Sequence, residues 1–166
     1  MPQLILSVSL PMKGVVFDLD ETLVDRRGTL DIYSKKLFSN FSDSAVLPQS
    51  DFTAAFHRLD NNGRIPRDEF FEAIAATLFQ DVPSLRIKKH FEATAWLDPL
   101  LFNGILDLLA SLRDQGLQIG VITNGGVSSQ SAKLGNSGLS KLVDAYVISA
   151  AFGLKKASTG NFQPHD

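Results

Sequence analysis

The chain has 166 residues, 44% hydrophobic and 20% charged, which predicts one domain with a buried core, or one domain with an insertion. Its formal net charge of −2 gives no electrostatic reason to expect nucleic acid or an anionic membrane as a partner. Because the chain has no cysteine, disulfides, thiolate zinc sites and a cysteine nucleophile are excluded, and a cytoplasmic location is expected.

The chain begins with a short apolar run at residues 4–10. This run is too short to span a bilayer, and it lacks the basic flank and cleavage site of a signal peptide. Because Met12 opens the sequence Met-Lys-Gly-Val-Val-Phe-Asp, we expect Met12 to be the natural start and residues 1–11 to be an N-terminal extension. An added edge strand is the alternative.

The first predicted strand, residues 15–17, is followed directly by acidic residues. Val-Val-Phe is typical of a strand in a parallel sheet that is covered on both faces. Asp18 and Asp20 follow it, and two residues apart on an extended chain their side chains share a face. Since ligands bind beyond the carboxyl ends of such strands, we expect both side chains to project into a ligand site.

Two neighbouring carboxylates at a strand end can carry out phosphoryl transfer. Asp18 could attack phosphorus and form an acyl-phosphate, while Asp20 could protonate the leaving oxygen and later accept a proton from water. Because both groups and the substrate are anionic, a hard cation such as Mg2+ would be needed. The alternative is a pair of solvated turn acids, with Thr22 as a helix N-cap.

The sequence Phe-Asp-Leu-Asp-Glu-Thr-Leu at residues 17–23 resembles the first motif of the haloacid dehalogenase-like (HAD) hydrolases, most of which are Mg2+-dependent phosphatases. The resemblance implies that Asp18 is the nucleophile and a metal ligand. It implies that Asp20 is the acid/base and offers its backbone carbonyl to the metal. Members that cleave carbon–halogen bonds usually lack the second aspartate, so its presence favours a phosphate ester over a haloacid. The expected partner is a small phosphorylated metabolite.

Residues 26–96 show apolar residues at helical spacing, interrupted at Pro48, at residues 63–66 and at Pro83. This pattern predicts a small helical bundle, which the resemblance identifies as a cap over the site. Its basic residues could contact substrate or could be solvated surface groups, and the candidates are Arg26, Arg27, His57 and Arg58.

Residues 58–69 are similar to an EF-hand loop when Gly63 takes the sixth position. The first position, which needs a carboxylate, is then occupied by Arg58. We therefore expect a turn between two helices rather than a calcium site.

After the bundle, residues 101–112 predict an amphipathic helix and residues 117–122 predict a buried strand. A hydroxyl and backbone N–H groups in a glycine-containing turn, ahead of another helix, could hold a phosphate oxygen. This segment resembles the second motif of the HAD family, which implies a phosphate-binding role for Thr123, Asn124 and Gly125.

A further helix over about residues 128–136 and a strand over residues 142–148 are predicted next. The following Gly-Leu-Lys-Lys segment at residues 153–156 resembles the approach to the third HAD motif. By this resemblance Lys156 would neutralise the nucleophile and the phosphate, while Lys155 would be solvated surface charge.

The predicted fold is α/β, with a Rossmann-like core of three parallel strands in residues 12–25 and 97–166 and an inserted helical cap in residues 26–96. The HAD pattern normally continues with a fourth, acidic motif that this sequence does not contain. We therefore expect a C-terminally truncated chain with an unprotected sheet edge, weak Mg2+ binding and impaired activity.

The leading hypothesis is Mg2+-dependent hydrolysis of a phosphomonoester through an aspartyl-phosphate at Asp18. A sugar-phosphate mutase or a C–X bond hydrolase of the same family is an alternative, and so is a non-catalytic truncated binding protein. The sequence leaves the substrate and the oligomeric state open.

Overall fold

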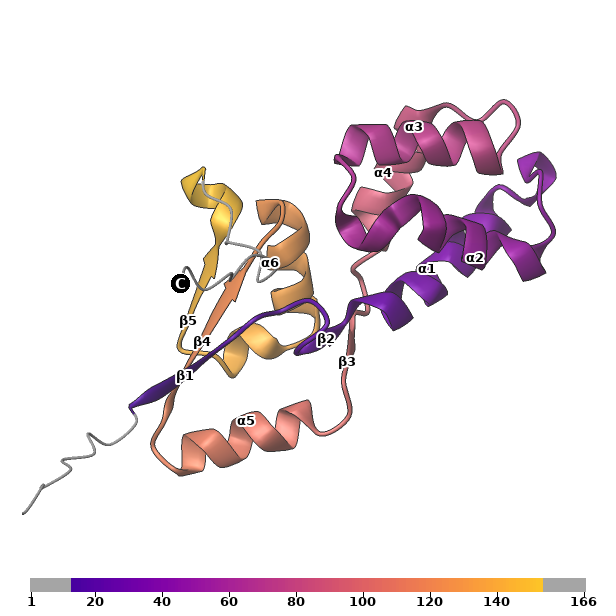
Figure 1. Ribbon diagram of the computed structural model, residues 1–166. Helices are drawn as coiled ribbons and strands as arrows, with labels where there is room; N and C mark the ends of the chain where they lie inside the picture. The colour runs from indigo at the N-terminus through magenta and orange to yellow at the C-terminus, as the bar shows by residue number, and fades with distance from the viewer. Residues whose placement is uncertain (1–12, 154–166) are drawn as a thin grey trace, which may run out of the picture.

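The computed structural model describes residues 13–153, which form a helical bundle and an α/β core (Figure 1). The elements of the core are β1 (Gly14–Phe17), α5 (Ile105–Asp114), β4 (Gln118–Thr123), α6 (Val127–Asn136) and β5 (Ala145–Ile148). The helices of the bundle are α1 (Arg26–Asn40), α2 (Gln49–Asp60), α3 (Arg67–Leu78) and α4 (Ser84–Thr94). Short 3-10 turns are η1 (Ser42–Ser44), η2 (Asn61–Gly63), η3 (Leu139–Lys141) and η4 (Ser149–Phe152).

The core sheet is parallel, with strand order β1-β4-β5. In its register Phe17 lies beside Val121, and Thr123 lies beside Ile148. The carboxyl ends of the three strands therefore meet at one edge. This arrangement confirms the predicted α/β fold with a parallel sheet, and it brings the loops after β1 and β4 together.

Only one face of this sheet is covered within residues 13–153. Leu109 of α5 and Leu134 of α6 belong to one hydrophobic cluster with the buried side chains of β4. On the other face Val16, Ile122 and Val147 are 62%, 39% and 41% exposed. The prediction of a strand covered on both faces is thus wrong for the described residues. Right-handed crossovers that step in the same direction along a sheet place both of their helices on the same side.

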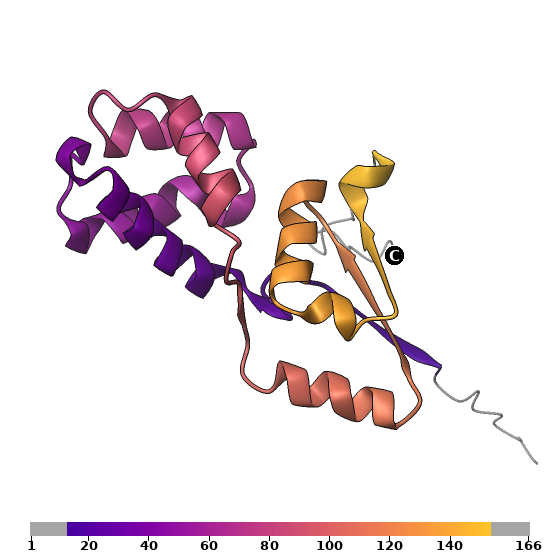
Figure 2. The same cartoon turned by 180° about the vertical axis from the view of Figure 1, so that it is seen from behind.

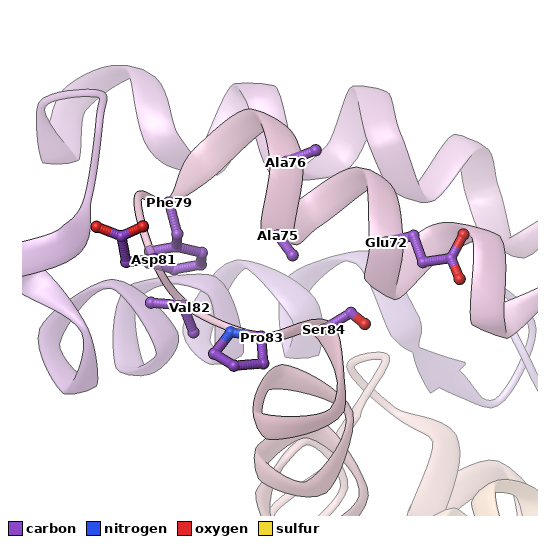
Figure 3. A pocket seen from close by; sticks show the side chains of 8 residues that line it. All are labelled: Glu72, Ala75, Ala76, Phe79, Asp81, Val82, Pro83 and Ser84. Atoms are coloured by element: carbon purple, nitrogen blue, oxygen red, sulfur yellow. The ribbon is translucent and has the colours of Figure 1, made fainter.

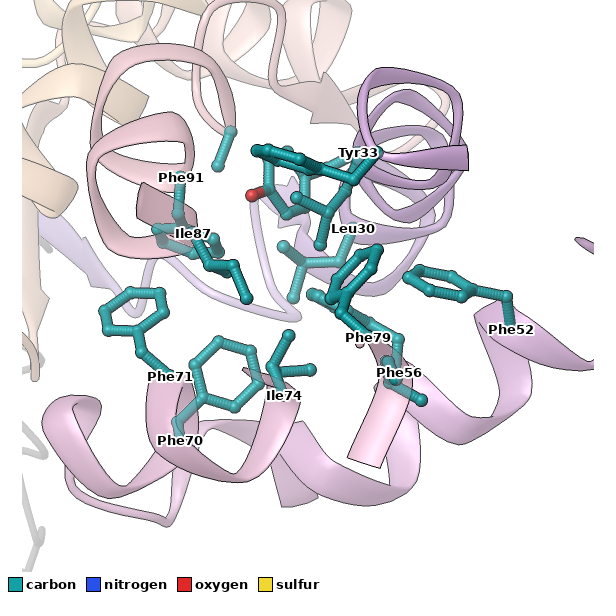
Figure 4. Close-up of a cluster of buried hydrophobic side chains, with 14 of the residues drawn as sticks. Leu30, Tyr33, Phe52, Phe56, Phe70, Phe71, Ile74, Phe79, Ile87 and Phe91 are labelled. Carbon is teal, nitrogen blue, oxygen red and sulfur yellow. The ribbon is translucent and has the colours of Figure 1, made fainter. Parts of the chain in front are cut away.

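The bundle has its own aromatic core, shown in Figure 4. Tyr33, Phe56, Phe70 and Phe91 are almost fully buried, and the ring centroids of Phe56 and Phe70 lie 5.6 Å apart in an edge-on arrangement. Aromatic pairs of this geometry contribute about 0.5–1.5 kcal/mol beyond their buried area. The bundle is therefore held together by a close-packed interior that is separate from the cluster under the sheet.

Prolines mark where the later helices of the bundle begin. Pro48, Pro66 and Pro83 immediately precede α2, α3 and α4. Proline fixes its φ angle and lacks the N–H that a continuing helix would need. The sequence breaks at these positions therefore coincide with the starts of helices.

The chain crosses between core and bundle twice, and the crossings pair with each other as β2 (Val24–Asp25) and β3 (Leu100–Leu101). Figure 2 shows them side by side. The Thr29 hydroxyl donates to the Asp25 carbonyl at 2.7 Å and accepts from the Leu100 N–H at 2.9 Å. Because residues 100–101 form this strand, the helix predicted from residue 101 begins only at residue 105.

Candidate functional site

A cavity of about 620 Å3 lies where the carboxyl edge of the sheet meets the bundle. The core lines it with Asp18 and Asp20 from the loop after β1 and with residues 123–126 from the loop after β4. The bundle lines it with residues 62–67, which connect α2 and α3. Segments that are far apart in the sequence thus form one cleft.

The structure places most of the sequence-predicted site residues in this cleft. Asp18, Asp20, Thr123, Asn124 and Gly125 all line it, because the parallel register of β1 and β4 puts their carboxyl ends next to each other. The sixth residue, at position 156, lies outside the described residues, and its role stays a prediction.

The Asp20 carboxylate is held by two side chains of α6. Lys133 donates from Nζ to both carboxylate oxygens, at 2.6 and 2.7 Å. Gln130 donates from Nε2 to Asp20 at 3.0 Å and to the Asn124 carbonyl at 2.9 Å. Charge-assisted hydrogen bonds of this kind are short and strong, so the carboxylate has a defined orientation at the cleft wall.

Lys133 is buried to an unusual degree for a lysine, with a side chain only 2% exposed. Its burial lowers the pKa of the ammonium to about 8, although the neighbouring Asp20 carboxylate raises it. The Nζ atom also lies 4.1 Å from the centre of the Trp96 ring, a favourable cation–π distance. The ammonium therefore lies between a carboxylate of the core and an aromatic ring at the end of the bundle.

Sequence reasoning missed Gln130 and Lys133, since residues 128–136 were interpreted only as a helix. One signal was available in the sequence. Gln130, Lys133 and Asn136 recur at three-residue spacing, which places polar groups on one face of the helix that follows the Thr-Asn-Gly turn.

The turn after β4 has the features of a phosphate-binding loop. Thr123 is buried, Gly125 has φ +135°, and a Cβ added at Gly125 would lie 2.4 Å from Gln130 Nε2. Helix α6 begins at Val127 with no side-chain cap on its first turn. The N–H groups of that turn lack acceptors within the helix, and a helix N-terminus favours an anion.

On the bundle side, a buried acid organises the loop over the cleft. Asp60 accepts from Arg26 at 2.7 Å, from Arg67 at 3.4 Å and from the Gly63 N–H at 3.1 Å. Asp60 is 2% exposed, and burial lowers the pKa of Arg67 although Asp60 opposes this. The residue that an EF-hand would use for calcium therefore binds two arginines and fixes the turn at residues 61–63.

The four basic residues proposed for the cap separate into two groups. Arg26 lines the cleft, whereas Arg27, His57 and Arg58 are not among the lining residues that the structure describes. His57 pairs with Asp31 instead. Sequence reasoning did not single out Arg64 and Arg67, which follow the turn at residues 61–63 and line the cleft together with Asn62 and Gly63.

The charges around the cleft favour a phosphate group. Its cationic side chains come from both parts of the chain and are Arg26, Arg64, Arg67 and Lys133. Asp18 and Asp20 supply negative charge in the lining, and Asp60 pairs with Arg26 and Arg67 behind it. Cations lining a cleft raise the local concentration of anionic substrates.

The oxygen donors at the cleft fit a magnesium ion. Mg2+ prefers oxygen ligands and binds through one or two carboxylates together with water and substrate phosphate, rather than in an all-protein cage. Asp18 and Asp20 both line the cleft, and their carboxylate and carbonyl oxygens are of the ligand type that Mg2+ takes. Within residues 13–153 no three His, Cys, Asp or Glu side chains cluster as a metal site. Water and substrate phosphate would therefore have to supply the remaining ligands of a bound Mg2+.

A second hollow of about 600 Å3 lies on the bundle between α3 and the start of α4 (Figure 3). Ala75, Val82 and Pro83 give it apolar walls, and its charged side chains are Glu72 and Asp81. With no basic group in its lining, it is not suited to a phosphate.

Across the described part of the chain, no helix combines the length and the apolar character needed to cross a bilayer.

Comparison with protein families and curated sequences gives a consistent result. A family profile described as haloacid dehalogenase-like hydrolase matches residues 12–163. A glyceraldehyde 3-phosphate phosphatase of Methanothermobacter thermautotrophicus is 27% identical over 158 residues, covering 92% of this chain and 69% of that protein. A protein of the same name from Methanocaldococcus jannaschii is 28% identical over 153 residues, covering 87% and 65%. The chain thus spans about two thirds of the length of these relatives.

A solved structure with the same fold is the HAD-hydrolase YfnB of Bacillus subtilis bound to magnesium. It superposes with a TM-score of 0.69 at 19% identity, covering 87% of this chain and 67% of that one. At this identity the similarity concerns the fold.

Proposed function

Because the chain belongs to the haloacid dehalogenase-like hydrolase family, we propose that it hydrolyses small phosphomonoesters through a covalent aspartyl-phosphate on Asp18. The observation that carries the proposal is the pairing of Asp18 and Asp20 with the Thr123 to Gly125 turn in a single cleft with a cationic lining. The two curated relatives are named as phosphatases of a three-carbon phosphate ester, which supports the choice of substrate class. A cavity of about 620 Å3 is large enough for a metabolite of that size.

In the first step the Asp18 carboxylate attacks phosphorus, and the bond between phosphorus and the leaving alkoxide oxygen breaks. Asp20 donates a proton to that oxygen. The phosphoryl oxygens are bound by the Thr123 hydroxyl and by the N–H groups of the turn and of the first turn of α6. The alcohol leaves, and the phosphoryl group remains on Asp18 as an acyl-phosphate.

In the second step a water molecule attacks the acyl-phosphate and Asp20 accepts its proton. The bond between phosphorus and the Asp18 oxygen breaks, which releases inorganic phosphate and regenerates the carboxylate. Both steps require Asp20 to exchange a proton near the same face of the phosphorus, and the fixed orientation of Asp20 by Lys133 and Gln130 supports this role.

The Asp18 carboxylate and the Asp20 carbonyl would hold Mg2+, which would offset the repulsion between the negative charges of the nucleophile and the phosphate. The proposed third-motif ammonium at position 156 would add to that neutralisation. We include residues 26–96 as a cap that excludes water from the reacting groups, with Arg64 and Arg67 facing the bound ester.

The test is an assay of inorganic phosphate release from a panel of small phosphate esters that includes glyceraldehyde 3-phosphate, with and without Mg2+. We expect activity that requires Mg2+ and falls at least 1,000-fold in Asp18→Asn, since that variant loses the nucleophile. Asp114→Asn is the matched control, because Asp114 is an exposed acid at the end of α5. It should leave the rate unchanged.

Other results would favour the alternatives. Transfer of phosphate between positions of one sugar, without release of inorganic phosphate, would indicate a mutase, and release of halide from haloacids would indicate a C–X hydrolase. A wild-type chain that releases no phosphate from any ester, but keeps a cellular effect that Asp18→Asn does not change, would indicate a non-catalytic binding protein.

A further inference from the structure

Helix α6 presents three polar side chains along one face, and each of them makes contacts outside the helix. Gln130 and Lys133 bind the Asp20 carboxylate. One turn further on, Asn136 donates from Nδ2 to the Trp96 carbonyl at 2.6 Å. The same helix face therefore contacts both the cleft and the chain segment that leaves the bundle.

Trp96 belongs to the bundle by its packing. Its side chain is buried in the aromatic cluster of the bundle, and its ring meets that of Phe91 edge-on at a centroid distance of 5.7 Å. It also marks the point where the bundle touches α6, through the Lys133 ammonium and the Asn136 amide. A shift of the bundle relative to the core would therefore move the ring on which the ammonium rests.

Docking α6 on the bundle does not by itself require a lysine. An apolar side chain would pack on Trp96 without the free-energy cost of removing an ammonium from water. The cost is offset here by two hydrogen bonds to Asp20 and by the ring face. Meanwhile the Asp20 side chain stays 24% exposed, so it is held on one side and remains accessible from the cleft.

From these contacts we infer that Lys133 and Trp96 are positioning residues for Asp20. The docking of the bundle fixes the Trp96 ring, the ring and Asp20 together fix the Lys133 ammonium, and the ammonium fixes the carboxylate. This inference rests on the proposed function only for the statement that Asp20 exchanges protons with substrate and water. The link between Trp96, Lys133 and Asp20 can be tested without any activity.

The first experiment uses the intrinsic fluorescence of Trp96, which is the chain's single tryptophan. Emission is measured for the wild type, Asp20→Ala, Lys133→Met and the double variant. Removing the carboxylate should change the emission when Lys133 is present and leave it unchanged in the Lys133→Met background. Additive changes would overturn the link. Lys141→Met, a change at an exposed lysine of η3, should match the wild type.

The second experiment measures kcat and KM with the best ester of the panel. Lys133→Met should lower kcat about 10-fold to 100-fold, since a displacement of about 1 Å can cost that much, and KM should stay within about twofold. Lys133→Arg should recover part of the lost kcat because it keeps the cation. Trp96→Leu should lower kcat, as Lys133→Met does. An unchanged kcat in Lys133→Met would overturn the positioning role.

Folding and function are separated by controls. Each variant is first compared with the wild type by circular dichroism and thermal unfolding. If Lys133→Met does not fold, the comparison is made with Lys133→Gln, which also removes the cation, and an unchanged emission and an unchanged kcat relative to Lys141→Met would contradict the inference. If the wild type has no phosphatase activity, the proposed function fails, and the fluorescence cycle alone decides whether the link exists.

Discussion

The bundle and the core differ in how completely they bury their apolar side chains. The bundle encloses an aromatic cluster between its helices, whereas the sheet of the core is covered on one face and exposes Val16, Ile122 and Val147 on the other within residues 13–153. The buried area that stabilises these residues is therefore concentrated in the bundle.

The candidate site therefore combines groups from a less buried sheet edge with supports from buried side chains. The candidate catalytic groups lie on loops at the edge of the less covered sheet, and buried contacts hold them from one side. Those contacts come from Lys133 and Gln130 of α6, while Asp60 orders the loop of the bundle that lines the same cleft. Three pairs of substitutions, each with a matched control, test this difference between the two regions.

The largest loss of stability is expected for a substitution in the aromatic core of the bundle. Phe56→Ala should lower the free energy of unfolding by about 3–5 kcal/mol, because it leaves a cavity in a close-packed interior. Val16→Ala, on the exposed face of the sheet, should change it by less than about 0.5 kcal/mol. Urea unfolding of both variants measures the contrast. Equal losses in the two variants would show that the exposed face is covered in solution.

The next effect is expected at the acid under the loop that lines the cleft. Asp60→Asn should cost about 3 kcal/mol, because it leaves the buried Arg26 guanidinium without a charged partner, and thermal unfolding measures this loss. Asp68→Asn is the matched control, since Asp68 forms an exposed ion pair with Lys88 and such pairs contribute little. A loss of stability in the control as large as that of Asp60→Asn would argue against a special role for the buried acid.

The smallest of the three losses of stability is expected at Gly125, in the turn after β4. Gly125→Ala should cost about 1–3 kcal/mol, because an alanine at φ +135° is strained and its Cβ would collide with Gln130. The displaced Gln130 should also lower kcat/KM. Gly135→Ala, in α6 with open space around it, should instead raise stability by up to about 1 kcal/mol. Calorimetry and phosphate release measure the two effects, and equal behaviour of both variants would contradict the prediction.

Local patterns in the sequence, together with the resemblance to the HAD family, predicted the main elements of the fold. Helical periodicity and the prolines predicted the bundle helices, and the apolar runs before Asp18 and Thr123 predicted adjacent parallel strands. The prediction of a sheet covered on both faces failed, because periodicity shows that a residue is apolar but not how many helices reach its side of the sheet.

The supports of the site could not be predicted in the same way. Lys133 lies 113 residues from Asp20 in the sequence, and only tertiary packing brings the two together. A lysine in a helix is usually solvated, and the three-residue spacing of Lys133 with Gln130 and Asn136 does not say which residue it would contact. The same reason explains why Arg64 and Arg67 were missed while Arg27 and Arg58 were considered.

The pairing of β2 with β3 has a consequence for how the two parts can vary. Because the segments entering and leaving the bundle are hydrogen-bonded neighbours, the core needs only a short antiparallel closure at this point, whatever is inserted between them. A different insert with the same closely spaced ends can replace the bundle without lengthening or re-routing the core. Under the proposed function, the part that selects the ester and the part that hydrolyses it can therefore diversify separately, except at the proposed contact through Trp96.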